Sequence, residues 1–189
     1  MIETVGIIGA GTMGNGIAQI CAAAGLNVTM VDISDAAVQR GLKTVGGSLD
    51  RLVSKEKMTA ADRDATLARI NATTDKSKLA ACDLVIEAAT ENEELKVKIL
   101  RDLCAGLKPS ALVATNTSSI SITRLAASTD RPDRFIGMHF FNPVPVMALL
   151  ELIRGLQTSD DTVAKAEAFA KRVGKVAITA KNSPGFAVN

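Results

Sequence analysis

A glycine-rich turn between an apolar strand and a helix constrains the fold of this chain more than any other feature. The strand pattern Thr4 to Ile8 runs directly into Gly9-Ala-Gly11-Thr-Met-Gly14, and a helical pattern of small residues follows. The first glycine of such a turn permits the tight bend, the second lets the backbone approach a pyrophosphate, and the third lets the helix pack against the strand. The free N–H groups at the start of the helix would face the phosphates. We therefore predict a dinucleotide site that includes Gly9, Gly11, Thr12, Met13 and Gly14.

An acidic residue at the end of the next strand narrows the choice of dinucleotide. Residues Val28 to Val31 resume a strand pattern, and Asp32 follows them, 18 residues after Gly14. A carboxylate at this place can accept hydrogen bonds from both ribose hydroxyls and would repel a 2′-phosphate, which favours NAD over NADP. Two alternatives stay open: FAD uses the same fingerprint, and a purely structural turn with Asp32 as a helix cap needs no ligand.

The remainder of the chain alternates short strand patterns with longer helical ones, which is typical of an α/β domain with a largely parallel sheet. Further strands are expected at residues 84–87, 112–114, 135–139, 149–153 and 176–179. Helices are expected up to residue 24 and at residues 38–52, 59–70, 93–107 and 160–173. Residues 43–67 contain no strand pattern, so this helical stretch is expected to project from the sheet. We predict a Rossmann-type domain over residues 1–183, with helices on both faces of the sheet.

Composition excludes several classes of protein. The 189 residues carry 22 Lys and Arg against 20 Asp and Glu, a balance that does not favour nucleic acid or an anionic membrane as the main partner. Aromatic residues make up 3% of the chain, so base-stacking platforms are not expected. No apolar run approaches the roughly 18 residues of a membrane span.

The cysteines and the single histidine bear on compartment and metal binding. The three cysteines form no C-x-x-C pair, so we expect buried thiols in a reducing compartment and not a disulfide frame or a zinc site. One histidine argues against a histidine-rich metal centre, and no metal is predicted. No leader pattern precedes the first apolar run, so a cytoplasmic protein is expected.

The single histidine is a candidate acid/base group. His139 lies among apolar residues, where a structural role in the core is the more common explanation. Glu151, however, occupies a second apolar strand, where a buried charge needs a partner. If the two strands are neighbours, Glu151 could hold one imidazole nitrogen and leave the other to exchange a proton with a substrate.

Polar residues follow another apolar strand at Thr115-Asn-Thr-Ser-Ser119. The carboxyl end of a parallel strand faces the ligand crevice, so Ser118 could contact a substrate carbonyl and Asn116 or Asn142 could position it. An equally good alternative makes Ser118 or Ser119 the N-cap of a helix over residues 120–127.

Taken together, these segments resemble the NAD-binding domain of the 3-hydroxyacyl-CoA dehydrogenases, particularly the bacterial 3-hydroxybutyryl-CoA type. The resemblance rests on residues 9–14, 115–119 and 139–144, on Glu87-Ala-Ala-Thr-Glu-Asn92, and on Asn182-Ser-Pro-Gly-Phe-Ala-Val-Asn189. It implies oxidation of (S)-3-hydroxyacyl-CoA to 3-oxoacyl-CoA with NAD, or the reverse reaction, as in fatty acid metabolism and β-oxidation.

The resemblance also implies roles for individual residues. His139 would be the catalytic acid/base with Glu151 as its partner, and Ser118 and Asn189 would bind the 3-oxygen region of the substrate. Cofactor contacts would come from Asp32, Glu91, Lys96, Ser118 and Asn142. Ser48 and Lys55 would meet the coenzyme A moiety, although a charge run such as Arg51 to Lys57 is usually a solvated helix face.

Members of this family continue into an all-helical C-terminal domain of about a hundred residues, which is absent from this chain. Residues 184–189 would begin the connection to that domain, which carries the homodimer interface and closes over the substrate. Two other hypotheses remain: a nucleotide-binding module without catalysis, and a related NAD(P)-dependent reductase of a hydroxy acid that carries no CoA.

Overall fold

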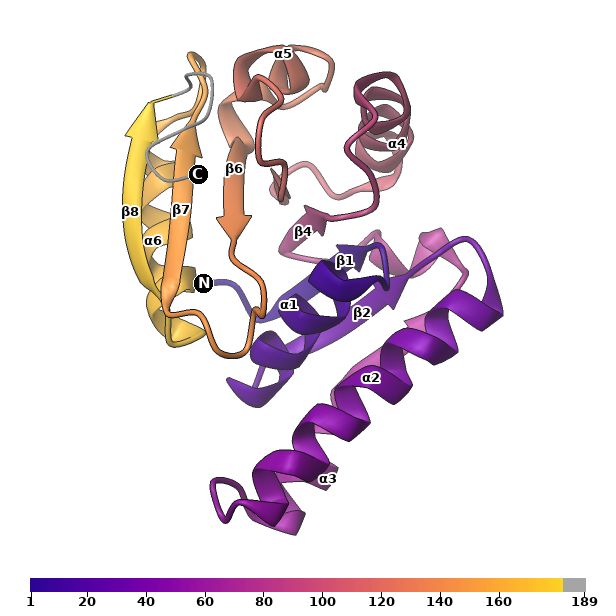
Figure 1. The fold of residues 1–189 in the computed structure, drawn as a ribbon. Coiled ribbons are helices and arrows are strands. Elements are labelled where there is room, and N and C mark those ends of the chain that lie inside the picture. Colours follow the sequence, from indigo (N-terminus) through magenta and orange to yellow (C-terminus); the bar gives the residue numbers. More distant parts are fainter. Residues whose placement is uncertain (182–189) are drawn as a thin grey trace.

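An eight-stranded sheet organises the chain, with the strands in the order β3-β2-β1-β4-β5-β6-β7-β8 (Figure 1). The computed structural model describes residues 1–181. The strands are β1 (Thr4–Ile8), β2 (Asn27–Val31), β3 (Ile70–Thr73), β4 (Leu84–Glu87), β5 (Leu112–Thr115), β6 (Phe135–Phe140), β7 (Leu149–Arg154) and β8 (Val176–Lys181). The α-helices are α1 (Thr12–Ala23), α2 (Asp35–Ser54), α3 (Ala60–Ala68), α4 (Glu93–Gly106), α5 (Ile122–Ala127) and α6 (Asp160–Arg172). Two short 3-10 helices lie at Lys76–Leu79 and Pro132–Arg134.

Strands β1 to β6 all run parallel, so their carboxyl ends meet at one edge of the sheet. Strand β7 is antiparallel to β6 and therefore begins at that same edge, and β8 runs parallel to β7. From β1 the chain passes to β2 on one side, while β4 pairs with β1 on the other side. Such a switch in strand order opens a crevice at the carboxyl edge, where ligands of doubly wound sheets bind.

Helices cover both faces of the sheet, as predicted, and successive strand residues are buried under the helices of opposite faces. Leu84 and Ile86 join the core beneath α1, α2 and α6, whereas Val85 joins the core beneath α4 and α5. Side chains alternate between faces along a strand, so Glu87 at the end of β4 points to the α4 face.

Helices α2 and α3 extend beyond the sheet, as the lack of strand pattern in this stretch predicts (Figure 1). Helix α2 buries only Val38, Gly41, Val45 and Leu49 over its 20 residues. An ion pair between Arg63 and Asp50, 2.6 Å long, joins the two helices at their exposed sides.

The predicted helix over residues 59–70 is wrong at its end. Helix α3 stops at Ala68, and Ile70 begins β3, which pairs with β2 through Ile70 and Val28. Ile70 is buried in this pairing. Its apolar side chain continues the spacing of a helix and equally suits a short strand, so the periodicity alone could not separate the two.

All three cysteines are free and buried, as expected. Burial raises the pKa of the Cys82 and Cys104 thiols to about 11, so both are protonated at neutral pH. Within residues 1–181, no helix is both long enough and apolar enough to cross a membrane.

Asp83 joins the amino ends of β1 and β4, at the edge opposite the crevice. Its carboxylate accepts hydrogen bonds from the backbone N–H of Glu3 and of Thr4, and from the Lys108 ammonium. Burial raises the pKa of Asp83, but these hydrogen bonds outweigh it and lower the pKa from its ordinary 3.8 to about 2.

The Asp83 carboxylate therefore contributes stability above about pH 4 that is lost as the pH falls toward 2. Because the pair is partly exposed, we expect Asp83→Asn to lower the free energy of unfolding at pH 7 by about 1–2 kcal/mol. Urea unfolding from pH 7 to pH 2 would measure this: the gap between wild type and variant should shrink below pH 4. An unchanged gap would contradict the role of the ionised carboxylate.

Candidate functional site

The glycine-rich turn occupies the centre of the carboxyl edge, between β1 and α1. Gly9 adopts a φ of +106°, and a Cβ atom there would lie 2.6 Å from the Ala88 carbonyl oxygen. A Cβ on Gly14 would lie 1.8 Å from the Gly9 carbonyl oxygen. A Cβ on Gly11, in contrast, would meet nothing within 4 Å. Gly9 and Gly14 are thus required by the turn itself, whereas Gly11 leaves open space at the start of α1.

Helix α1 also lacks the cap that the other helices have. Within residues 1–181, each of the other five α-helices begins with a Ser, Thr or Asn side chain that accepts a backbone N–H. Helix α1 begins at Gly11 with no side-chain cap and no acidic residue in its first turn. Its N–H groups and positive dipole end are therefore available to an anion in the open space at Gly11.

Asp32 lies beside this turn at the end of β2. Its Oδ2 accepts the Ala10 N–H at 2.8 Å, and its Oδ1 accepts the Ile33 N–H at 2.7 Å. These bonds fix the carboxylate next to the glycine turn, and each oxygen keeps acceptor capacity for a ribose hydroxyl. The open space at Gly11, the uncapped helix and the fixed carboxylate together fit the pyrophosphate and ribose of a dinucleotide.

His139 and Glu151 lie opposite each other on β6 and β7. Glu151 is completely buried, the His139 side chain is 12% exposed, and His139 Nδ1 lies 3.7 Å from Glu151 Oε1. This distance exceeds a normal hydrogen bond and suits an ion pair once the imidazole is protonated; catalytic hydrogen bonds are often this long without ligand. The ring of Phe141 packs on the imidazole with 4.5 Å between centroids. The predicted pairing of the two strands is thereby confirmed.

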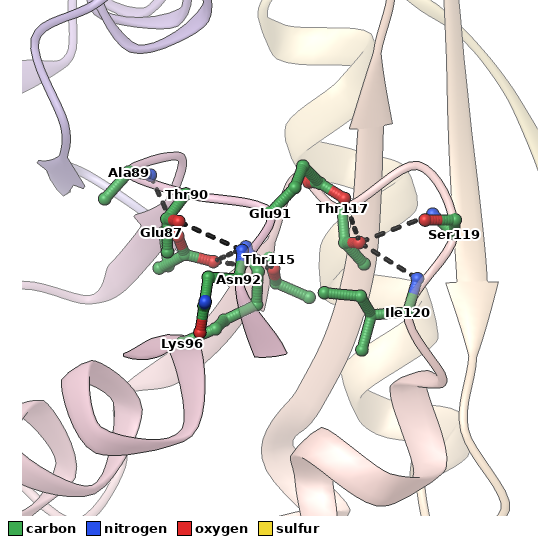
Figure 2. Close-up of polar contacts among 10 residues, drawn as sticks. All are labelled: Glu87, Ala89, Thr90, Glu91, Asn92, Lys96, Thr115, Thr117, Ser119 and Ile120. Carbon is green, nitrogen blue, oxygen red and sulfur yellow. Dashed lines mark hydrogen bonds and ion pairs between the residues drawn. The ribbon is translucent and has the colours of Figure 1, made fainter. Parts of the chain in front are cut away.

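The loop after β5 brings Ser118 to the same edge. Thr117 donates a hydrogen bond to Glu91 at 3.0 Å and accepts the Ile120 N–H at 3.1 Å (Figure 2). Ser118 is exposed, and the cap of α5 is Ser121, which accepts the Arg124 N–H. The alternative in which Ser118 or Ser119 caps this helix is therefore wrong.

Asn116 ties this loop to the strand that carries the histidine. Its Oδ1 accepts the Phe140 N–H at 2.9 Å, next to His139. The sequence suggested Asn116 as a possible substrate group; the structure gives it a structural role at the end of β6.

A buried polar cluster lies beneath these loops. It joins Lys96, for which the resemblance implies a cofactor contact, to Glu87 and Thr115, to which the sequence assigned no role. Glu87 forms an ion pair with Lys96 and accepts the Thr115 hydroxyl at 2.8 Å (Figure 2). Lys96 is 1% exposed and also lies 3.3 Å from the Thr115 oxygen. Glu87 ends an apolar strand, Asp32 follows one and Glu151 interrupts one, and this shared pattern of an acid on an apolar strand was the signal available in the sequence.

A groove of about 420 Å³ separates α1 and α2 from the loop after β6. It brings together the predicted contacts Ser48, Lys55 and Asn142 with Thr12 of the glycine turn. Arg51 and Lys57 add two further cations to its lining. Asn189 and the predicted connection at residues 184–189 lie outside the described residues.

Comparisons with known proteins agree with this geometry. The sequence matches the family described as "3-hydroxyacyl-CoA dehydrogenase, NAD binding domain" over residues 4–183. A 3-hydroxybutyryl-CoA dehydrogenase of Bradyrhizobium diazoefficiens is 52% identical to this chain over all of its 189 residues. This alignment covers 64% of the length of the relative. The crystal structure of (S)-3-hydroxybutyryl-CoA dehydrogenase PaaH1 from Ralstonia eutropha is 67% identical and superposes with a TM-score of 0.99 over all of this chain and 67% of that one.

A more distant structure shares the fold with a different chemistry in its name. It is 5-formyl-3-hydroxy-2-methylpyridine 4-carboxylic acid 5-dehydrogenase, an NAD+-dependent dismutase, which is 32% identical with a TM-score of 0.89 over 99% of this chain and 60% of that one.

Alanine substitutions at two glycines of the turn, Gly11 and Gly14, separate cofactor binding from stability. Because a Cβ at Gly11 fills the space in front of α1 and touches nothing, Gly11→Ala should weaken NADH binding about tenfold or more while the unfolding temperature stays near that of wild type. Gly14→Ala should instead lower the free energy of unfolding by about 3 kcal/mol. NADH fluorescence titration and thermal unfolding separate the two effects. Wild-type NADH affinity in Gly11→Ala would show that the cofactor does not approach this turn.

Proposed function

The chain belongs to the 3-hydroxyacyl-CoA dehydrogenase family as its NAD-binding domain, and from this premise we propose that it oxidises (S)-3-hydroxyacyl-CoA to 3-oxoacyl-CoA with NAD, or catalyses the reverse. One observation carries the proposal: the His139–Glu151 pair lies at the same edge of the sheet as the glycine turn. The chain spans 64% of the length of the Bradyrhizobium relative, so the activity of the whole protein is part of this proposal.

The proposed chemistry needs a proton acceptor beside a hydride acceptor. Bound NAD supplies the hydride acceptor. In oxidation, His139 takes the proton of the 3-hydroxyl on Nε2, the ring nitrogen opposite the one that faces Glu151. Glu151 stabilises the resulting imidazolium, because its fully buried carboxylate lies in surroundings of low polarity where the attraction is strong. Ser118 and Asn189 would hold the substrate oxygen, with Glu91, Lys96 and Asn142 on the nicotinamide side of the cofactor.

The groove beside α2 is proposed to bind the coenzyme A moiety. Arg51, Lys55 and Lys57 give it positive charge suited to phosphates, and Ser48 adds a hydroxyl. The full-length protein is proposed to dimerise through a C-terminal helical domain and to work in the cytoplasm.

The related structure with a pyridine carboxylic acid in its name supports a second candidate: a hydride transfer on a substrate without CoA, using the same histidine pair. In the first candidate the basic groove binds the coenzyme A moiety of the substrate, and in the second it binds no coenzyme A. A third hypothesis is cofactor binding without catalysis, which predicts no turnover in any assay.

A first experiment measures loss of NADH absorbance on addition of acetoacetyl-CoA, with NADPH as the paired control. The 189-residue chain is assayed alone and fused to the C-terminal third of the Bradyrhizobium relative. We expect turnover with NADH and little with NADPH, because Asp32 repels a 2′-phosphate. Reduction of free oxo acids but not of CoA esters by the fusion would favour the second candidate, and NADH binding without any turnover would favour the third.

The acid/base role is tested in the same fusion by His139→Gln. This variant should bind NADH as wild type does and lose turnover by roughly 10²–10⁴-fold, because the side chain no longer accepts a proton. The control is Lys78→Ala, which removes an exposed side chain beside the amino ends of β1, β2 and β3, at the edge opposite the crevice. Turnover within a few fold of wild type in His139→Gln would sink the assignment.

Lys55→Glu tests the groove. Reversing this charge should raise KM for acetoacetyl-CoA about tenfold and leave kcat and the affinity for NADH nearly unchanged, since uniform binding is lost. An unchanged KM at low salt would mean that Lys55 is only a solvated surface residue.

A further inference from the structure

The ion pair between Glu87 and Lys96 is an unusual feature for the interior of a small domain. The two side chains are 0% and 1% exposed. Burying two charges costs about as much as their attraction returns, so such a pair is weak support for stability and often could be replaced by apolar residues. The Glu87–Lys96 pair is therefore better explained by a role other than stabilising the fold.

The Glu87 carboxylate connects three elements beneath the crevice. Its Oε2 accepts the Ala89 N–H at 2.8 Å, which fixes the start of the loop after β4. Its Oε1 accepts the Thr115 hydroxyl at 2.8 Å and contacts the Lys96 ammonium on α4 (Figure 2). The ends of β4 and β5 and the first turns of α4 are thereby held at one point.

The loop fixed in this way forms part of the cofactor crevice. Its Ala88 carbonyl approaches Gly9 so closely that a Cβ there would lie 2.6 Å away. At its other end Glu91 accepts the Thr117 hydroxyl from the loop that carries Ser118. Residues 88–92 therefore connect the glycine turn to the loop after β5, and Glu87 sets their position from below.

We infer that Glu87 is a positioning residue for the dinucleotide site: its carboxylate, neutralised by Lys96, sets residues 88–92 against the glycine turn before the cofactor binds. The inference rests on the proposed function, since a fixed crevice wall reduces the ordering that must otherwise accompany NAD binding. Glu87 acts through the loop and touches neither cofactor nor substrate.

The test compares two double variants that lack the same lysine. Glu87→Gln with Lys96→Met is neutral and keeps an oxygen that can accept the Ala89 N–H; Glu87→Leu with Lys96→Met is neutral and keeps none. Both variants therefore lose equally any contact that Lys96 itself makes with the cofactor, and the comparison reports on residue 87 alone. Neither variant leaves a buried charge unpaired, so both are expected to fold. The Leu/Met variant should be the less stable of the two, because its Ala89 N–H has lost the carboxylate acceptor.

NADH fluorescence titration of the 189-residue chain should show the Leu/Met variant binding about tenfold more weakly than the Gln/Met variant. Asp83→Asn is the control for lost stability, because it removes a partnered carboxylate next to the same strand at the opposite edge; it should bind NADH as wild type does. Equal affinities of the two folded double variants would overturn the inference. Failure of the wild-type chain to bind NADH would contradict the proposed function itself.

Amide hydrogen exchange of the wild-type chain provides a second test that needs no substitution. The Ala89 N–H should be protected without cofactor to nearly the degree of the β4 amides, because a buried carboxylate holds it. Exchange of Ala89 at the rate of an open loop would overturn the inference, even if a double variant does not fold.

Discussion

The site depends on the close approach of the glycine turn to the end of β4. No side chain fits between Gly9 and Ala88, nor between Gly14 and the Gly9 carbonyl. This contact brings the start of α1 to the centre of the carboxyl edge, where the helix end stays uncapped and the space at Gly11 stays open. The open space in front of α1 therefore follows from a steric constraint on backbone atoms.

Carboxylates placed on otherwise apolar strands complete the site, each with a different partner. Asp32 is fixed by two backbone N–H groups, Glu87 by an ammonium and a hydroxyl, and Glu151 lies against an imidazole. A buried carboxylate is costly without such a partner. Asp32 keeps acceptor capacity on both oxygens, and Glu87 holds the Ala89 N–H at the start of the loop after β4. Glu151 lies where the proposed reaction needs an acid beside the histidine.

Much of the fold and part of the site could be predicted from the sequence. Local patterns were sufficient for the glycine turn, for Asp32, and for the strands that carry His139 and Glu151, because each feature is encoded within a few neighbouring residues. Strand β3 escaped prediction, since Ile70 continues the apolar spacing of the preceding helix. Lys96 shows a second limit, because its partner Glu87 lies on another element and only the three-dimensional fold brings the ammonium under the loop. The roles of Ser118, Asn189 and the other predicted site residues stay predictions.

A crystal structure of the chain, fused to the remaining domain of a relative and soaked with NAD+ and acetoacetyl-CoA, which cannot exchange a hydride, would test the central claim most directly. We expect the pyrophosphate at Gly11, the adenosine ribose on Asp32, and the 3-oxygen of the substrate within hydrogen-bond distance of His139 Nε2. A nicotinamide ring bound away from His139, or a substrate oxygen held by other groups, would contradict it.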